Sequence, residues 1–226
     1  MNRIGIVCLS TLAGICLTTA GHAASLVNGD LEQPGGDPYR YFITQSDKVT
    51  GWTYSGPSED GIYESDDTGD GIAAQSGKFY VSFGHDGLTG GALSQTFNTI
   101  VGQAYTVSYW VTQQQGNDPT QSATASVADS SSMVIGTNSI FLTMATGTWV
   151  EEMLQFIATT GSTTLTIADT TAPGAAAGAN WALDTISVDA APATSTTPLP
   201  ATLPLFASGL AGLGWLARRR RNPAAA

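Results

Sequence analysis

Cysteine is almost absent from this chain of 226 residues: only Cys8 and Cys16 carry a thiol, and both lie in an apolar N-terminal stretch. If that stretch is removed, the remaining chain has no cysteine, which excludes a disulfide scaffold, a zinc–thiolate site and a cysteine nucleophile. Histidine is equally scarce, because His85 is the only one beyond residue 22. A metal site would therefore have to use oxygen ligands, which suit calcium.

Basic residues are few, and most of them lie at the two ends of the chain. Between the ends only Arg40, Lys48 and Lys78 are basic, against all 18 acidic residues. The resulting formal charge of −15, from 3 basic against 18 acidic residues, repels a phosphate backbone. The middle of the chain is therefore not expected to bind nucleic acid.

The N-terminus, residues 1–23, reads as a signal peptide. Arg3 supplies the positive start, residues 4–17 form a short apolar core, and residues 21–23 offer the small residues that a signal peptidase requires. We expect cleavage after Ala23. The alternative is a lipoprotein signal at Cys16, but Ile15 interrupts its motif.

The C-terminus divides into three parts. Residues 190–200 form a Pro/Thr/Ala linker without hydrophobic periodicity. Residues 201–217 are apolar and uncharged, and they are long enough for one short transmembrane helix. Residues 218–226 begin with four arginines, which are expected to stay in the cytoplasm. This order predicts at least a C-terminal membrane anchor.

In its details this tail resembles the PEP-CTERM sorting signal, in which a proline-containing motif, an apolar helix and an arginine-rich end follow one another. The matching residues are Pro198, Leu199 and Pro200, then the apolar stretch, then Arg218, Arg219, Arg220 and Arg221. The Pro-Leu-Pro motif departs from the family's Pro-Glu-Pro. The resemblance implies recognition by an exosortase-type membrane protease and delivery to the surface or extracellular matrix of a Gram-negative bacterium.

The central domain, residues 24–189, alternates apolar and polar residues with a period of two. Along residues 105–112, Tyr105, Val107, Tyr109 and Val111 share one face. Further β-rich or alternating runs lie at 78–83, 140–144, 150–156, 164–168 and 181–188. Turn residues separate these runs, so the sequence predicts an all-β, antiparallel β-sandwich or barrel.

Several short motifs of this domain, in their order, resemble galactose-binding-like jelly rolls, which include many carbohydrate-binding modules. They occupy residues 26–32, 51–52, 91–97, 102–107 and 182–188, with Leu31 where that family has Phe. The resemblance implies a jelly roll of eight or more strands whose first and last strands lie close together.

The same resemblance implies a structural calcium ion held by Glu32 and Asp184, with Asp30 near by. Carboxylates from chain segments that meet in space supply the oxygens that calcium requires. The alternative is that Asp184 caps a turn and Glu32 is solvated. A second acidic stretch covers residues 59–71, and its segment 66–71 starts like a calcium loop. A polar loop is favoured because Gly77 stands at the distal ligand position.

Sugar-binding modules stack aromatic rings on sugars and pair hydroxyls with polar side chains. The candidates for ligand binding are Trp110, Tyr54, Tyr63, His85 and Asp86. Trp110 is favoured because its neighbours on the same face are Thr and Ser, although a core position is an open alternative. We assign Trp52 and Trp181 to the core.

The sequence gives little sign of an enzyme. It has no Gly-x-Ser-x-Gly motif, and Glu151 and Glu152 are adjacent on one predicted strand and so point to opposite faces. We expect a non-enzymatic domain that binds carbohydrate weakly. The alternatives are a structural matrix protein without a ligand site, for which Trp52 and Trp110 are both buried, and a glycoside hydrolase with two carboxylates in a cleft.

Overall fold

The computed structural model describes residues 24–33, 35, 40–42, 49–57, 61–65, 72–115, 120–174 and 180–192, with Leu210, Leu213, Trp215 and Arg218. The chain forms two compact units, Met1–Ala191 and Pro192–Ala226. The predicted signal peptide and the motif 198–200 lie outside the described residues. Within the described part of the chain, no helix is sufficiently long and apolar to cross a bilayer.

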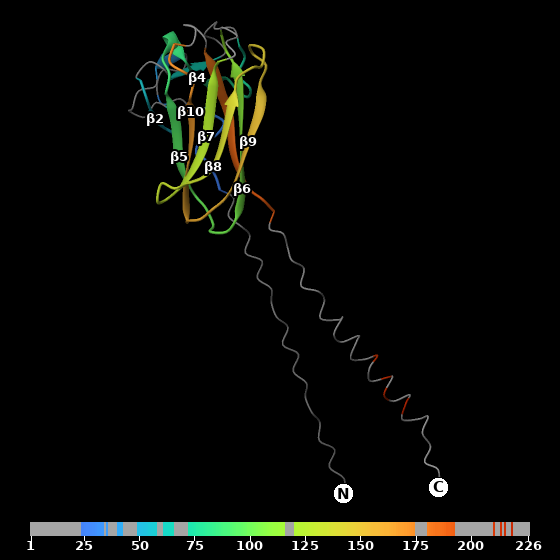
Figure 1. The fold of residues 1–226 in the computed structure, drawn as a ribbon. Helices are drawn as coiled ribbons and strands as arrows, with labels where there is room; N and C mark the ends of the chain where they lie inside the picture. Colours follow the sequence, from blue (N-terminus) through green and yellow to red (C-terminus); the bar gives the residue numbers. More distant parts are fainter. Residues whose placement is uncertain are drawn as a thin grey trace, which may run out of the picture. The chain divides into compact units, whose positions relative to one another are not determined.

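Eleven strands of the described residues form two antiparallel sheets, which confirms the predicted all-β sandwich (Figure 1). The six-stranded sheet has the order β1 (Arg40–Phe42), β3 (Ile62–Ser65), β4 (Phe79–Phe83), β11 (Trp181–Ala190), β6 (Ala104–Gln113), β9 (Val150–Ile157). The five-stranded sheet has the order β2 (Thr53–Ser55), β5 (Ala92–Asn98), β10 (Ser162–Asp169), β7 (Ser122–Asp129), β8 (Val134–Phe141).

The core lies between the two sheets and is built by alternate residues of each strand. The inward residues of β6 are at most 1% exposed, as the alternation predicts, and Leu165 and Ile167 of β10 are fully buried. The Phe83 and Trp181 rings stack in this core with centroids 4.7 Å apart. The burial of this apolar surface stabilises the sandwich.

Strand β11 departs from the simple alternation that its sequence predicts. Its pairing with β6 shifts register between Asp184 and Ser187, and Thr185 has φ 43°. Trp181 and Leu183 before this bulge and Ile186 and Val188 after it therefore all join the core. The prediction that residues 181–188 alternate without interruption is wrong, because one bulge exchanges the two faces of a strand.

The N-terminal motif meets this bulge, which agrees with the expectation that the first and last segments lie together. Residues 27–30 form a turn and not a strand, and Gly29 accepts a hydrogen bond from Ile186 N at 2.6 Å. A Cβ on Gly29 would overlap the Ile186 carbonyl oxygen. Glycine is therefore required where the two chain segments come closest.

One end of the sandwich gathers the β7–β8 hairpin turn, two connections that cross between the sheets and the last residues of β11; we call it the exit end. Its turns are 99–103, 130–133 and 158–161, because Asn98 pairs with Ser162 and Asp129 with Thr163. The last residue of β11, Ala190, pairs with Tyr105. The chain thus leaves the sandwich at the exit end (Figure 1).

Candidate functional site

Trp110 lies half-buried on the outer surface of the six-stranded sheet. The register places its neighbours on β11 and β9 in three rows, which we call the Trp110 face. The rows are Asp184–Trp110–Glu151, Ser187–Ser108–Met153 and Asp189–Thr106–Gln155. The three members from β9 are all exposed, and the exposed fraction of Met153 is 56%. The face therefore presents an indole, a thioether, hydroxyls, an amide and carboxylates to solvent.

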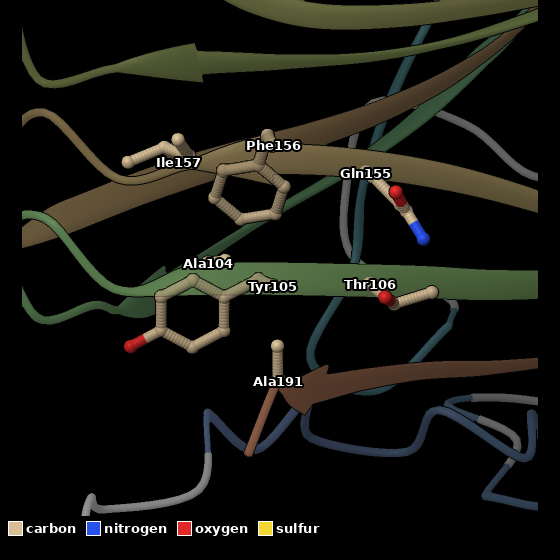
Figure 2. A pocket seen from close by; sticks show the side chains of 7 residues that line it. All are labelled: Ala104, Tyr105, Thr106, Gln155, Phe156, Ile157 and Ala191. Carbon is tan, nitrogen blue, oxygen red and sulfur yellow. The ribbon is translucent and has the colours of Figure 1, made fainter. Parts of the chain in front are cut away.

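A hollow of about 320 Å³ lies at the lower end of this face, towards the exit end (Figure 2). Its lining residues are Ala104, Tyr105, Thr106, Gln155, Phe156, Ile157 and Ala191. The rings of Tyr105 and Phe156 belong to the core and stack with centroids 5.3 Å apart. Trp110 and Ala104 are six positions apart along β6, so the face and its hollow extend over about 20 Å.

Two of the carboxylates predicted to bind calcium hold one loop over the same sheet. Asp184 Oδ2 accepts hydrogen bonds from Gln75 N at 2.8 Å and Ser76 N at 3.1 Å. Glu32 Oε1 accepts hydrogen bonds from Lys78 N and Phe79 N, both at 2.9 Å. We call this arrangement the carboxylate clamp. It fixes the loop of residues 75–79 to both the last strand and the N-terminal segment.

Gly77 lies in the middle of the clamped loop, between the two pairs of bonded amides. Its φ is 61°, and a Cβ at this position would overlap the carboxylate of Glu32. The loop can approach Glu32 this closely only because residue 77 has no side chain.

The carboxyl group of Asp184 is fully buried. Burial raises its pKa from 3.8 to about 7, and the hydrogen bonds from Ser76 N, Thr185 N and Gln75 N offset part of that rise. Oδ1 is engaged by Thr185 N at 2.6 Å. Asp184 is thus a structural carboxylate that lies beneath the loop of residues 75–79. This loop forms the upper border of the Trp110 face.

The donor set of the clamp fits calcium in part. Glu32 and Asp184 reach the same loop from different segments, but Asp30 is exposed and joins neither. Nowhere among the described residues do three His, Cys, Asp or Glu side chains gather as a metal cluster. A calcium ion here would have to take its remaining ligands from backbone carbonyls and water.

The other predicted ligand-binding residues are not brought to Trp110. Tyr54 is 3% exposed and lies in the core, where its hydroxyl donates to Pro57 O at 2.6 Å, so its ring is not available to a ligand. Only the backbone of Tyr63 is described, and it pairs with Val81.

His85 and Asp86 lie in a short 3₁₀ turn, His85–Gly87, after β4. His85 Nδ1 is 3.6 Å from Asp86 Oδ2, and the Asp86 side chain is 77% exposed. In the register Phe83 is level with Gln113, so this turn lies beyond the strand ends and away from Trp110. The predicted ligand residues therefore lie in different places: Trp110 on the outer surface of the six-stranded sheet, and His85 and Asp86 in the turn after β4.

The assignment of Trp52 and Trp181 to the core is confirmed. Trp52 is 2% exposed and its Nε1 donates to Asn28 O at 3.0 Å, while Trp181 is fully buried. Sequence reasoning missed Met153 and Gln155 as members of the face. The signal was present, because both occupy outward positions of the alternating run 150–156, but nothing in the sequence placed that run beside Trp110.

Comparison with known proteins identifies one family and a set of similar folds. The model of the DUF642 family, described as a protein of unknown function, matches residues 24–188. No curated protein matches the sequence.

Many solved structures resemble the chain, including the following three. A Stig cyclase from Fischerella sp. TAU shares 13% identity over 76% of this chain and 99% of its own, with a TM-score of 0.57. An arabinose-bound GH51 α-L-arabinofuranosidase shares 13% identity over 76% of this chain and 27% of its own, with a TM-score of 0.51. The module TmCBM61 in complex with β-1,4-galactotriose shares 16% identity over 63% of this chain and 90% of its own, with a TM-score of 0.49. At these identities the first two resemblances establish the fold alone.

Proposed function

The chain belongs to the DUF642 family of unknown function, and from the residues of the Trp110 face we propose that its domain is a non-enzymatic module that binds polysaccharide weakly. The observation that carries the proposal is the half-buried indole of Trp110 on the outer surface of the sheet, among outward hydroxyl, amide and thioether groups. An aromatic ring packs on the apolar face of a sugar, while neighbouring polar groups exchange hydrogen bonds with its hydroxyls.

The charge of the face favours a neutral polysaccharide as the ligand. Glu151 and Asp189 lie on it, and none of its described residues is basic. Acidic sugars would be repelled by these carboxylates and by the net charge of −10 of the whole chain. Weak affinity is expected because the site is one aromatic ring on an open sheet surface, with a shallow hollow beside it.

The two alternatives are less well supported by this geometry. A hydrolase would need two accessible carboxylates close together. Asp184, across Trp110 from Glu151, is fully buried under the clamped loop, and the exposed Asp189 lies two rows away from Glu151. A matrix protein without a ligand site was expected to bury both Trp52 and Trp110, yet only Trp52 is buried.

We further propose that the chain is exported and sorted by its ends. The support is in the sequence: a signal peptide at residues 1–23, the motif 198–200, an apolar stretch at 201–217 and the arginines 218–221. An exosortase-type protease would process this tail, and the final location would be the cell surface or matrix. A calcium ion bound at the carboxylate clamp would be structural, since Asp184 is shielded from any sugar.

Binding to immobilised neutral polysaccharides, measured by affinity gel electrophoresis or calorimetry, tests the proposal. Trp110→Ala is expected to weaken binding about twofold to tenfold, because aromatic contacts contribute about 0.5–1.5 kcal/mol beyond buried area. Phe141→Ala is the matched control, since Phe141 is also an exposed aromatic (71%) but lies on β8 of the other sheet. If the Trp110→Ala variant and the parent chain bind equally well, the Trp110 face is not the binding site.

A further inference from the structure

The exit end carries an unusual concentration of exposed apolar side chains. Five large ones lie there, each at least 45% exposed: Ile100 45%, Val101 64%, Met133 66%, Val134 60% and Ile157 60%. They come from one hairpin and from two connections between the sheets, which are distant from one another in sequence. Single exposed apolar residues are ordinary on a protein surface, but a group of them at one end marks an interaction site.

Backbone contacts show that these side chains belong to neighbouring turns. Gly102 N donates to Ala158 O at 2.8 Å, and Ala158 N donates to Gln103 O at 3.0 Å, which joins the turn of Val101 to that of Ile157. The start of β8 also lies against β9, because a Cβ on Gly136 would be 3.2 Å from Phe156 Cβ. The five side chains therefore border one continuous surface at the exit end.

The turns of the exit end offer no positive charge that would attract an anionic partner. Its turns, 99–103, 130–133 and 158–161, contain no Lys or Arg. Two carboxylates lie at this end: Asp189, which is exposed near the end of β11, and Asp129, which is bonded within its own turn. Asp129 Oδ1 accepts from Ser131 N and Met133 N, and the Thr159 hydroxyl donates to Oδ2. The surface offers apolar area without cations, so it suits an uncharged apolar environment.

The chain leaves the domain through this same end. Ala191 N donates to Ala104 O at 2.8 Å, and Gln103 Nε2 donates to Ala191 O at 2.7 Å. The apolar stretch 201–217 begins ten residues later in the sequence. Ten residues span at most about 35 Å, so a membrane that holds this stretch lies within that reach of the exit end.

From these observations we propose that the exit end rests on a lipid bilayer, with Ile100, Val101, Met133 and Val134 entering its interfacial layer. The contact rests on the proposed C-terminal anchor, which holds the domain at the membrane until the tail is processed. Apolar tips gain by leaving water for the boundary between headgroups and acyl chains. Because no cation takes part, zwitterionic lipids suffice and the contact is insensitive to salt. The Trp110 face is left free for polysaccharide.

The test uses the full chain, with Cys8 and Cys16 replaced by serine, in phosphatidylcholine vesicles. A single cysteine at Val101→Cys carries an environment-sensitive fluorophore, and Ser126→Cys, on the outer face of the five-stranded sheet, is the matched control. In vesicles the Val101 probe is expected to shift its emission to the blue and to lose at least fivefold of its quenching by iodide. The Ser126 probe is expected to change in neither respect. Added salt should leave both results unaltered.

A second pair of variants checks the apolar mechanism. With the probe at Met133→Cys, the double substitution Ile100→Ser/Val101→Ser is expected to restore at least half of the iodide quenching; both residues are exposed, so the fold is retained. A chain that floats with the vesicles while its Val101 probe stays as quenched as the Ser126 probe refutes the contact and leaves the anchor standing. A chain that does not float refutes both. Protection of Val101 without vesicles identifies contact between copies instead and also overturns the proposal.

Discussion

The protonation of Asp184 should make the stability of the domain fall as pH rises, which is opposite to the behaviour of most carboxylates. Its carboxyl group is fully buried, and burial raises its pKa from 3.8 to about 7. Between these values the group is protonated in the folded chain and ionised in the unfolded chain. The folded state therefore binds more protons, and its stability decreases as pH rises through this window.

The size of the effect follows from the two pKa values. At about 1.4 kcal/mol per pKa unit, the difference between 3.8 and about 7 corresponds to about 4 kcal/mol. The contribution is fully favourable below pH 3.8 and is lost once the pH has passed about 7. Other carboxylates of the chain titrate as well, so only a comparison with a variant isolates this contribution.

Urea unfolding at intervals from pH 4 to pH 8, in the presence of a chelator, measures the free energy of unfolding of the parent chain and of Asp184→Asn. The variant has no ionisable group at this position, so the difference between the two chains should change by about 4 kcal/mol across the series. Asn also leaves Thr185 N facing an amide donor, which lowers its stability by a constant amount of about 1–3 kcal/mol. Parallel pH profiles of the two chains would refute the reasoning.

Calcium extends the same experiment, because a bound cation favours the ionised carboxylate and lowers its pKa. If calcium binds the clamp, its addition at pH 7 raises the melting temperature of the parent chain and not that of Asp184→Asn. An unchanged melting temperature of the parent chain on chelation would dismiss the proposed ion.

Two further predictions concern single side chains. Gly77→Ala should lower the free energy of unfolding by about 1–3 kcal/mol in thermal or urea unfolding, because φ is 61° and the added Cβ overlaps Glu32; an unchanged stability would show that the clamp is loose. Burial raises the pKa of Tyr109 to about 12, so the tyrosinate absorbance of the folded chain should show a step near pH 12 that Tyr109→Phe removes, and stability should fall above pH 10; a titration complete by pH 10.5 in the folded chain would contradict this.

The sandwich could be predicted because its strands alternate strongly. In β6 every second residue from Tyr105 to Val111 is buried, and in β10 Leu165 and Ile167 follow the same period. Period-two alternation reports which face of a strand is apolar, and two-sheet packing is the ordinary way to bury such faces. Burial and sheet class therefore follow directly from the sequence pattern.

The bulge of β11 and the clamp could not be predicted in the same way. A bulge depends on the register against a partner strand, and the bond from Ile186 N to Gly29 O joins residues 157 positions apart. The resemblance to jelly rolls did place Glu32 and Asp184 in one region, but it did not show that both accept backbone amides of the loop 75–79. Tyr54 failed as a surface candidate because one aromatic ring on a short strand has no pattern that separates core from surface.

The bulge of β11 links the clamp to the Trp110 face. Asp184 is the last residue before the register shift, and it points outward beside Trp110 while Leu183 before it and Ile186 after it point into the core. With unbroken alternation Ile186 would lie on the outer face with Asp184, and the core would lose a buried side chain. The bulge therefore allows one strand to bury both apolar pairs and still direct a carboxylate to the loop 75–79. That loop in turn bounds the surface on which Trp110 lies half-buried, so the border of the proposed sugar site is set by the closure of the chain's first and last segments.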